Sequence, residues 1–219
     1  MGNICSSLSN NVTNSVSREV NRASNNATSG VQQTANKATK QLVTNLGSSK
    51  IQKRMITDFD DFKRSWESEA HSPYDSIAYY VIAALNIPTN RALANAMMTV
   101  VVTKGDTVPS STSPSGLSLT RNAVYFIDQL VKSDHIAKSY VGGTPTNDYR
   151  IDPMNLVMTV VKEQDNGGDG KRKIFIQSGG KDYPTPISVA RNGAGQWKLM
   201  EYSSICTGVQ KTKGEQGDF

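Results

Sequence analysis

The sequence predicts an α+β protein in which about four helices precede a small antiparallel sheet of about four strands, behind a long polar N-terminal segment. Three observations lead to this prediction. Capping residues and apolar side chains at helical spacing recur between residues 57 and 131. After Tyr140, short apolar runs alternate with glycine-rich turns, as in antiparallel sheets. Residues 8–50, by contrast, contain no aromatic residue and no proline.

The N-terminal segment begins with an acylation pattern. Met1 to Ser7 read Met-Gly-Asn-Ile-Cys-Ser-Ser, which fits N-myristoylation of Gly2. Cys5 lies where a second acyl chain could be added. Because one myristoyl chain binds a membrane only marginally and two signals hold it, Gly2 and Cys5 together form a candidate lipid anchor. The alternative interpretation is an ordinary start codon followed by glycine.

Positive charge is concentrated in residues 1–54. This segment has seven basic side chains and one acidic one, a net charge of +6, whereas the whole chain has +5, so residues 55–219 are close to neutral. A basic segment of this kind favours an acidic surface, and its cations are candidate docking residues on anionic lipid or an acidic protein lattice. These docking candidates are Arg18, Arg22, Lys37, Lys40, Lys50, Lys53 and Arg54.

A thin apolar stripe of Val, Ala and Leu runs from Val12 to Leu46 at a spacing close to the helical period. Gly30 interrupts the stripe and weakens the helix it would form. Alone in water such a helix is marginal, so we expect it to form only against a membrane interface, a partner or the protein's own body. Disorder of the isolated segment is the alternative that its composition favours.

The first two predicted helices follow this segment. Thr57 and Asp60 have the spacing of a capping box, and apolar residues at helical spacing continue to Trp66. Ser72 can cap a second helix, which has proline at its favoured first position and an apolar face over residues 74–85.

Two further helices are predicted before Tyr140. Asn90 can cap a helix whose inward residues run to Val101. After a loop rich in serine and proline, Ser118 or Thr120 opens a fourth helix, with apolar residues on one face as far as Val131.

Four strands are predicted after the helices, at residues 156–161, 173–177, 187–190 and 196–202. In the last one, Trp197 and Leu199 alternate on the face expected to meet the core, and Lys198 falls on the other face. The chain therefore divides into a tail at 1–54, an α+β domain at 55–209 and a polar C-terminal tail at 210–219.

No motif in the chain predicts catalysis. The only histidines, His71 and His135, lie far apart and outside any metal-ligand spacing, so both are read as surface or capping residues. Cys206 has no histidine near it in sequence, and the glycine-rich stretch at 165–170 lacks the glutamate that a calcium loop needs. We therefore expect no metal and no cofactor, although an enzyme whose site is assembled from distant residues remains an alternative.

Four short blocks carry a resemblance to a known family. They are Ser72-Pro73-Tyr74, Ala137-x-Ser139-Tyr140 with Gly143-x-Pro145, Phe175-Ile176-x-Ser178-Gly179-Gly180-x-Asp182 and Gly195-x-Trp197-x-Leu199-x-Glu201-Tyr202-Ser203-Ser204. With them, residues from about 59 to 209 resemble an uncharacterised domain family found mostly in bacteria and in some protists. The resemblance implies an α+β domain, and it implies no catalytic residue because the family has no established activity.

The leading hypothesis is a non-enzymatic interaction or structural protein docked through its N-terminal segment on an anionic membrane surface. The first alternative is a structural component of a cytoskeletal assembly, such as a flagellar or ciliary doublet microtubule, with tubulin as the acidic partner. The second alternative is an enzyme with an unrecognised site. Two cysteines, and no apolar run typical of a signal peptide, favour an intracellular location, and no nucleic acid partner is expected.

Overall fold

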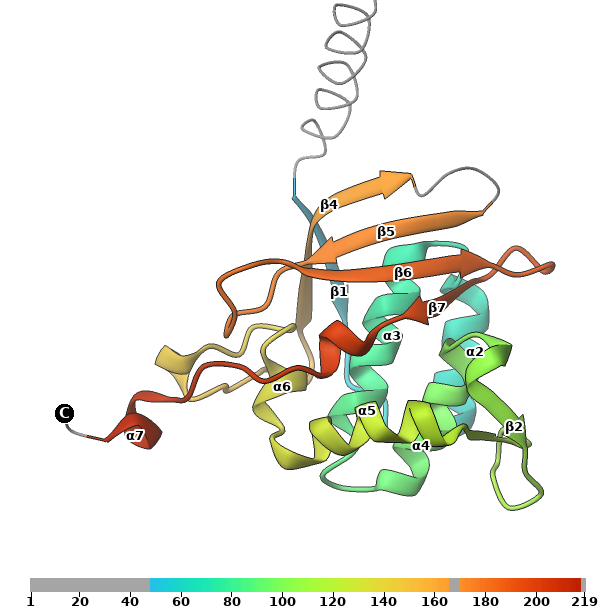
Figure 1. The fold of residues 1–219 in the computed structure, drawn as a ribbon, viewed down its shortest axis with the longest axis horizontal. Helices are drawn as coiled ribbons and strands as arrows, with labels where there is room; N and C mark the ends of the chain where they lie inside the picture. Colours follow the sequence, from blue (N-terminus) through green and yellow to red (C-terminus); the bar gives the residue numbers. More distant parts are fainter. Residues whose placement is uncertain (1–47, 166–169, 218–219) are drawn as a thin grey trace, which may run out of the picture. The chain divides into compact units, whose positions relative to one another are not determined.

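A five-stranded antiparallel sheet and the helices packed on one of its faces make up the structure (Figure 1). It is a computed structural model that describes residues 48–165 and 170–217. The predicted α+β class, with helices first and a sheet after them, is confirmed. The predicted lipid anchor, the apolar stripe, the tail cations from Arg18 to Lys40 and most of the glycine-rich stretch after Asp165 lie outside the described residues.

The four predicted helices are present, and three of the expected caps are confirmed. The side chains of Ser72, Asn90 and Thr120 each accept a hydrogen bond from the backbone N–H three residues on. The first helix is capped one residue later than predicted. Asp58, not Thr57, accepts the N–H of Asp61, because Asp58 is the last extended residue before the helix. The helices are α2 (Phe59–Glu69), α3 (Pro73–Leu85), α4 (Arg91–Val101), α5 (Arg121–Lys132) and the short α6 (His135–Lys138) and α7 (Lys213–Gln216).

All four predicted strands are present in one sheet of order β1-β4-β5-β6-β7, with antiparallel neighbours throughout. The strands are β1 (Ser49–Lys53), β4 (Leu156–Asp165), β5 (Lys171–Ile176), β6 (Thr185–Arg191) and β7 (Trp197–Glu201). A separate hairpin of β2 (Thr107–Pro109) and β3 (Leu117–Leu119) lies in the segment that was expected to be a loop.

Strand β1 was not predicted, and it brings residues of the expected tail into the folded domain. It pairs with β4 along its whole length, and Ile51 lies opposite Met158. Its sequence, Ser-Lys-Ile-Gln-Lys, holds a single apolar residue, so no alternation could be recognised. The sheet therefore begins at Ser49, before the expected boundary at residue 54.

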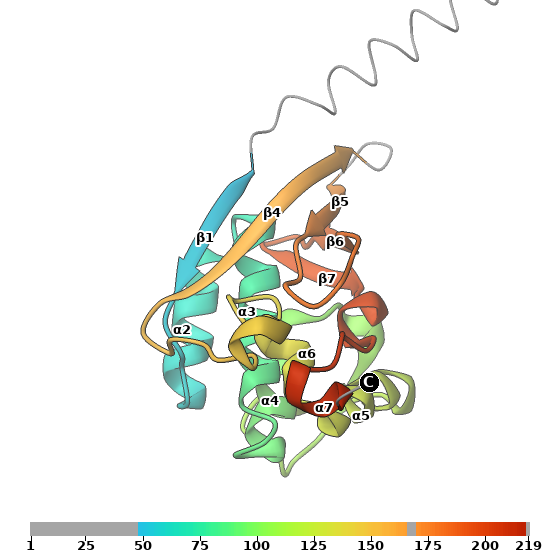
Figure 2. The same cartoon turned by 90° about the vertical axis from the view of Figure 1, so that its left-hand side faces the viewer.

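Helix α3 lies at the centre of the core. Every residue from Ser76 to Ala84 is buried, which requires packing on all sides of the helix. Figure 2 shows α3 between the sheet and the other helices. From the sheet, Trp197 and Leu199 face this core with 7% and 0% of their surface exposed, as their alternation predicts. The Ser76 hydroxyl donates to the Trp197 carbonyl, which joins α3 to β7.

Candidate functional site

The sheet has one face against the helices and one face that no described helix covers. Along β4, buried Leu156, Met158 and Val160 alternate with half-exposed neighbours, and on β5 Ile174 and Ile176 do the same. Because alternate residues of a strand point to opposite faces, the intervening side chains lie on the outer face. We call this surface of β1, β4 and β5 the outer sheet face.

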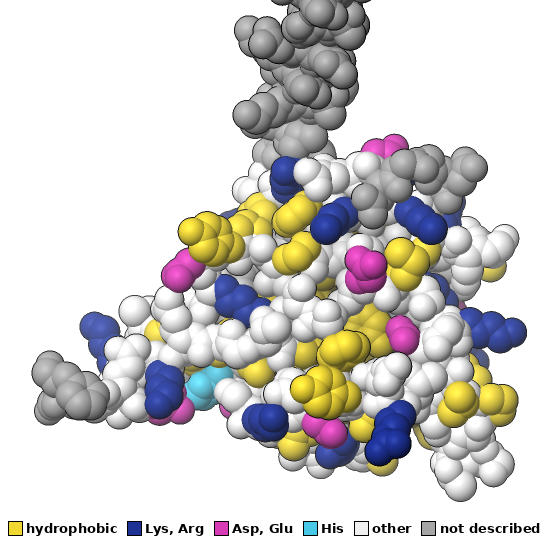
Figure 3. All heavy atoms as spheres, in the orientation of Figure 1, with side chains coloured by type: hydrophobic (Ala, Val, Ile, Leu, Met, Phe, Trp, Pro, Cys, Tyr) yellow, Lys and Arg dark blue, Asp and Glu magenta, His cyan; other side chains and the backbone are white. Residues whose placement is uncertain are grey.

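Four lysines are the charged side chains on the outer sheet face. Lys50 lies opposite Thr159 of β4, and Lys162 lies opposite Phe175 of β5. Lys171 and Lys173 share the face of Phe175, because they alternate with buried Ile174 along β5. The Lys162 ammonium lies 5.3 Å from the centre of the Phe175 ring. Figure 3 shows Lys, Arg and hydrophobic side chains over the part of the domain where β4 and β5 lie, with Asp and Glu side chains beside them.

Of the three predicted docking cations that the structure describes, only Lys50 lies on this face. Lys53 points to the opposite side, where it forms ion pairs with Glu69 and Asp75. Burial lowers the pKa of Lys53, but the two carboxylates outweigh burial and the net effect is a raised pKa. Arg54 pairs with Asp61 at 2.8 Å. Lys53 and Arg54 therefore link β1 and the residue after it to α2 and α3, and their docking role stays a prediction.

A second place of interest is a cavity of about 390 Å³ between the C-terminal end of α4, the β2–β3 hairpin and the β6–β7 turn. We call it the basic pocket, since Lys104, Arg191 and Lys198 line it and no described carboxylate does. Lys104 and Arg191 are exposed at its rim. The apolar part of the lining consists of Val102, Leu117 and Ala190. The hydroxyl groups in the lining belong to Thr99, Thr103 and Thr107.

Lys198 is the inner cation of the basic pocket and is half-buried. Its ammonium donates to the carbonyl of Val100 and lies 3.9 Å from the centre of the Trp66 ring. No carboxylate of the described residues lies within ion-pair distance of it. Burial lowers the pKa of Lys198 to about 8.

A third cluster lies where three of the four sequence blocks meet. Lys181 donates to the Tyr140 hydroxyl at 2.7 Å, the Ser204 carbonyl at 2.9 Å and the Thr207 hydroxyl at 2.7 Å. These acceptors use all three donors of the ammonium group. Burial lowers the pKa of Lys181 to about 8. The amine is thus saturated by its neighbours, and its role here is to join the segments around Tyr140 and Ser204.

The turn at Gly179 packs against the same segments. The Ser178 and Ser139 hydroxyls are hydrogen-bonded at 2.8 Å, and the Gly179 N–H donates to the Ser139 carbonyl at 2.7 Å. A Cβ atom at Gly179 would lie 2.2 Å from the Gly143 carbonyl oxygen, so only glycine allows this approach. Gly179 therefore serves the close packing of its turn against the segment at Gly143.

Cys206 lies beside this cluster in the short 3₁₀ segment Ser203–Cys206. Its sulfur lies 3.7 Å from the Tyr80 hydroxyl in the core, and only 2% of the residue is exposed. Burial raises the pKa of the thiol to about 11. Cys206 is therefore a neutral core thiol at physiological pH and not an activated nucleophile.

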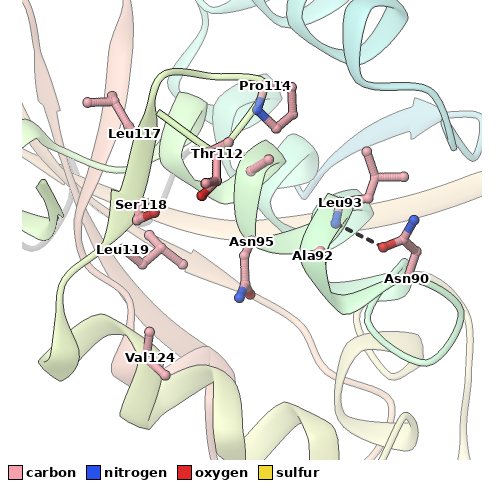
Figure 4. A pocket seen from close by; sticks show the side chains of 12 residues that line it. Asn90, Ala92, Leu93, Asn95, Thr112, Pro114, Leu117, Ser118, Leu119 and Val124 are labelled. Atoms are coloured by element: carbon pink, nitrogen blue, oxygen red, sulfur yellow. Dashed lines mark hydrogen bonds between the residues drawn. The ribbon is translucent and has the colours of Figure 1, made fainter. Parts of the chain in front are cut away.

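A neutral cavity of about 470 Å³ lies between the start of α4, the loop before β3 and α5. In Figure 4, Asn95 extends from α4 into this space, with Leu119 and Val124 nearby. The Asn95 Oδ1 atom is buried and has no hydrogen-bond partner among the described residues. The lining carries no charged side chain, so the cavity suits a water molecule or a small neutral donor.

The two histidines lie in separate surroundings. His135 stacks on Tyr149 with ring centres 4.5 Å apart, near Asp134 and Glu215. His71 is exposed after the end of α2. Within residues 48–165 and 170–217, no group of three or more His, Cys, Asp and Glu side chains is arranged to hold a metal ion. In the same residues, no helix combines the length and the apolar character needed to cross a bilayer.

Comparison with known proteins places most of the chain in one family. No curated protein and no solved structure matches it. A family model described as a domain of unknown function (DUF6935) matches residues 54–213, close to the range over which the sequence blocks were recognised. Helices α2 to α6, strands β2 to β7, the basic pocket and the Lys181 cluster all lie within it. The chain therefore belongs to the DUF6935 family.

Proposed function

We propose that this protein is a non-enzymatic interaction module held on an anionic membrane surface by its N-terminal segment, with the outer sheet face as a second contact. The observation that supports the proposal is the set of four lysines on β1, β4 and β5. Strand β1 directly follows the N-terminal segment, so Lys50 continues its series of cations into the folded domain.

The energetics of the two contacts complement each other. Each lysine close to an anionic leaflet contributes about 1 kcal/mol, and the attraction decays within a Debye length. A single myristoyl chain gives only marginal, reversible binding. Lysines on the outer sheet face therefore supply the additional attraction that a chain acylated only at Gly2 needs. Val157 and Phe175 on the same face, and Pro186 opposite Phe175 on neighbouring β6, are half-exposed and add apolar surface.

The test is co-sedimentation of the full-length protein with vesicles of phosphatidylcholine, with and without phosphatidylserine. We expect Lys162→Glu with Lys173→Glu to reduce binding to the anionic vesicles about tenfold or more at low salt, and to leave the weak binding to neutral vesicles unchanged. The matched control is Lys132→Glu with Lys211→Glu, which makes the same charge change at exposed positions away from the sheet.

An equal loss of binding to anionic vesicles in the two double variants would show that only the total charge matters. It would contradict a role for the outer sheet face. The same lysines fit the acidic surface of a protein lattice such as a microtubule, which is the alternative partner. Preferential sedimentation with polymerised tubulin, and none with anionic vesicles, would replace the membrane by that alternative.

A further inference from the structure

We infer that the basic pocket between α4, the β2–β3 hairpin and the β6–β7 turn is a binding site for a small organic anion with an apolar body. This inference concerns a site separate from the outer sheet face and does not depend on membrane docking. Its evidence is the combination of a cavity of about 390 Å³, three lining cations and an apolar wall.

The first argument comes from the surroundings of the Lys198 ammonium group. A cation removed from water is stabilised by an anionic partner, and without one it is costly to bury. Lys198 has no carboxylate within ion-pair distance among the described residues; it contacts the neutral carbonyl of Val100 and the face of the Trp66 ring, and the more distant Glu67 offsets only part of the effect of burial on its pKa. An ammonium group has three donors, and the Val100 carbonyl accepts one of them. The remaining donors have no hydrogen-bond partner among the described residues, and under this inference they bond a carboxylate or phosphate in the cavity.

The rim supports the same ligand class. Lys104 and Arg191 line the pocket from two different elements, Lys104 after α4 and Arg191 at the end of β6. Arg191 is oriented by its own turn, because its Nε donates to the Gly195 carbonyl at 2.9 Å. Two exposed cations beside a half-buried one attract anions into the cavity and disfavour cationic ligands.

The rest of the lining defines the body of the ligand. Val102, Leu117 and Ala190 offer apolar contact, and the hydroxyls of Thr103 and Thr107 can bond a polar substituent. The volume lies near the lower end of the range of about 300–1,000 Å³ typical of small-molecule sites. A short-chain or single-ring carboxylate or phosphate fits this description, whereas a nucleic acid or a folded partner does not.

The experiment uses the full-length protein, with octanoate as the anionic probe and octanamide as its neutral counterpart. Calorimetric titration should give saturable binding of octanoate, and octanamide should bind at least tenfold more weakly. Amide resonances of Val102, Thr103 and Ala190 should shift in two-dimensional NMR spectra on addition of octanoate. Lys198→Met should weaken octanoate binding at least tenfold, and Lys132→Met, at the exposed C-terminal end of α5 and outside the lining of the pocket, should leave it unchanged.

A second variant keeps the test decisive if Lys198→Met does not fold. Lys104→Ala with Arg191→Ala changes only exposed side chains and should weaken octanoate binding about threefold to tenfold. The inference is overturned by equal binding of octanoate and octanamide, by undisturbed resonances around the cavity, or by full octanoate affinity in the Lys104/Arg191 variant.

Discussion

The ammonium nitrogen of Lys198 lies 3.9 Å from the centre of the Trp66 ring, so β7 and α2 meet through a cation and an aromatic face. Such a contact contributes about 0.5–2 kcal/mol, depending on how far it is desolvated. Two hydrogen bonds to the backbone of the neighbouring residue, Trp197, reinforce this contact. The Trp197 N–H donates to the Ala70 carbonyl at 2.7 Å, and the Ser76 hydroxyl donates to the Trp197 carbonyl at 2.8 Å. Strand β7 is thus attached to the ends of both α2 and α3.

We predict that stability rises between about pH 8 and pH 9. Burial lowers the pKa of Lys198 and of Lys181 from the ordinary 10.5 to about 8. Above pH 8 the folded protein loses these protons while the unfolded chain keeps them, so raising the pH favours folding. Above about pH 9 the Cys206 thiol ionises in the unfolded chain, whereas in the folded protein the thiol, with its pKa of about 11, does not. This difference favours the unfolded chain and opposes any further gain in stability.

Urea unfolding at several pH values measures this effect. The free energy of unfolding of Lys198→Met should rise less between pH 8 and pH 9 than that of the wild-type protein. The free energy of unfolding of Lys132→Met should rise as much as that of the wild-type protein. An identical rise in Lys198→Met would mean that Lys198 keeps its ordinary proton affinity in the folded state.

Replacing Trp197 by alanine should lower the free energy of unfolding by about 3–5 kcal/mol, because a large side chain with 7% exposure leaves a cavity beside α3. The matched control is Tyr183→Ala, where the side chain is 82% exposed and the expected change is within about 0.5 kcal/mol. Both values come from thermal or urea unfolding. A loss below about 1 kcal/mol at Trp197 would place its side chain outside the core.

Two truncations test whether β1 belongs to the domain. A chain starting at Ser48 should unfold cooperatively, whereas one starting at Met55 should be less stable by about 2 kcal/mol or more, the scale of one large apolar side chain. The shorter chain loses Ile51 from the sheet and the ion pairs of Lys53 with Glu69 and Asp75. Equal stability of the two truncated chains would show that β1 contributes nothing to the core.

Lys181→Met should destabilise the domain by about 1–3 kcal/mol, because the Tyr140 hydroxyl and the Ser204 carbonyl lose this donor in a partly buried setting. The comparison variant is Lys173→Met, which removes a lysine from the outer sheet face without breaking such contacts. Chemical denaturation of both variants gives the difference. Unchanged stability of Lys181→Met would indicate that solvent replaces the amine fully.

Gly2→Ala should move the protein from the membrane fraction to the soluble fraction of its own cells, because a single remaining signal binds weakly. Fractionation of cells expressing either form measures the change, and intact-mass analysis shows whether a fatty acyl group is present. The proposed anchor is wrong if the variant fractionates like the wild-type protein.

The helices could be predicted in detail because their signals are local. Ser72, Asn90 and Thr120 each precede an apolar face at helical spacing, and each is a cap in the structure. Strand β4 was predicted to end at Val161 but continues to Asp165. Beyond Val161 the strand extends past the core with polar side chains, so the apolar pattern ends before the hydrogen bonding does.

The candidate sites could not be predicted because their residues are distant in sequence. Lys181 meets partners 41 and 23 residues away, at Tyr140 and Ser204. The basic pocket joins the end of α4 to the β6–β7 turn, some ninety residues later, and Lys198 looked like one outward residue of a strand. Only the three-dimensional arrangement shows that this lysine lies against Trp66.

The two edges of the sheet have different consequences for self-association. On the β7 side, the Thr103 N–H donates to the Leu199 carbonyl, so the segment after α4 occupies the edge. On the other side β1 is the last strand of the described sheet, and an open edge can recruit a strand from a second molecule. Strand β1 is only five residues long and carries lysine at two of them, a composition that discourages such pairing. At a crowded surface, where copies of the protein would be concentrated, these lysines would keep neighbouring sheets from merging into fibres.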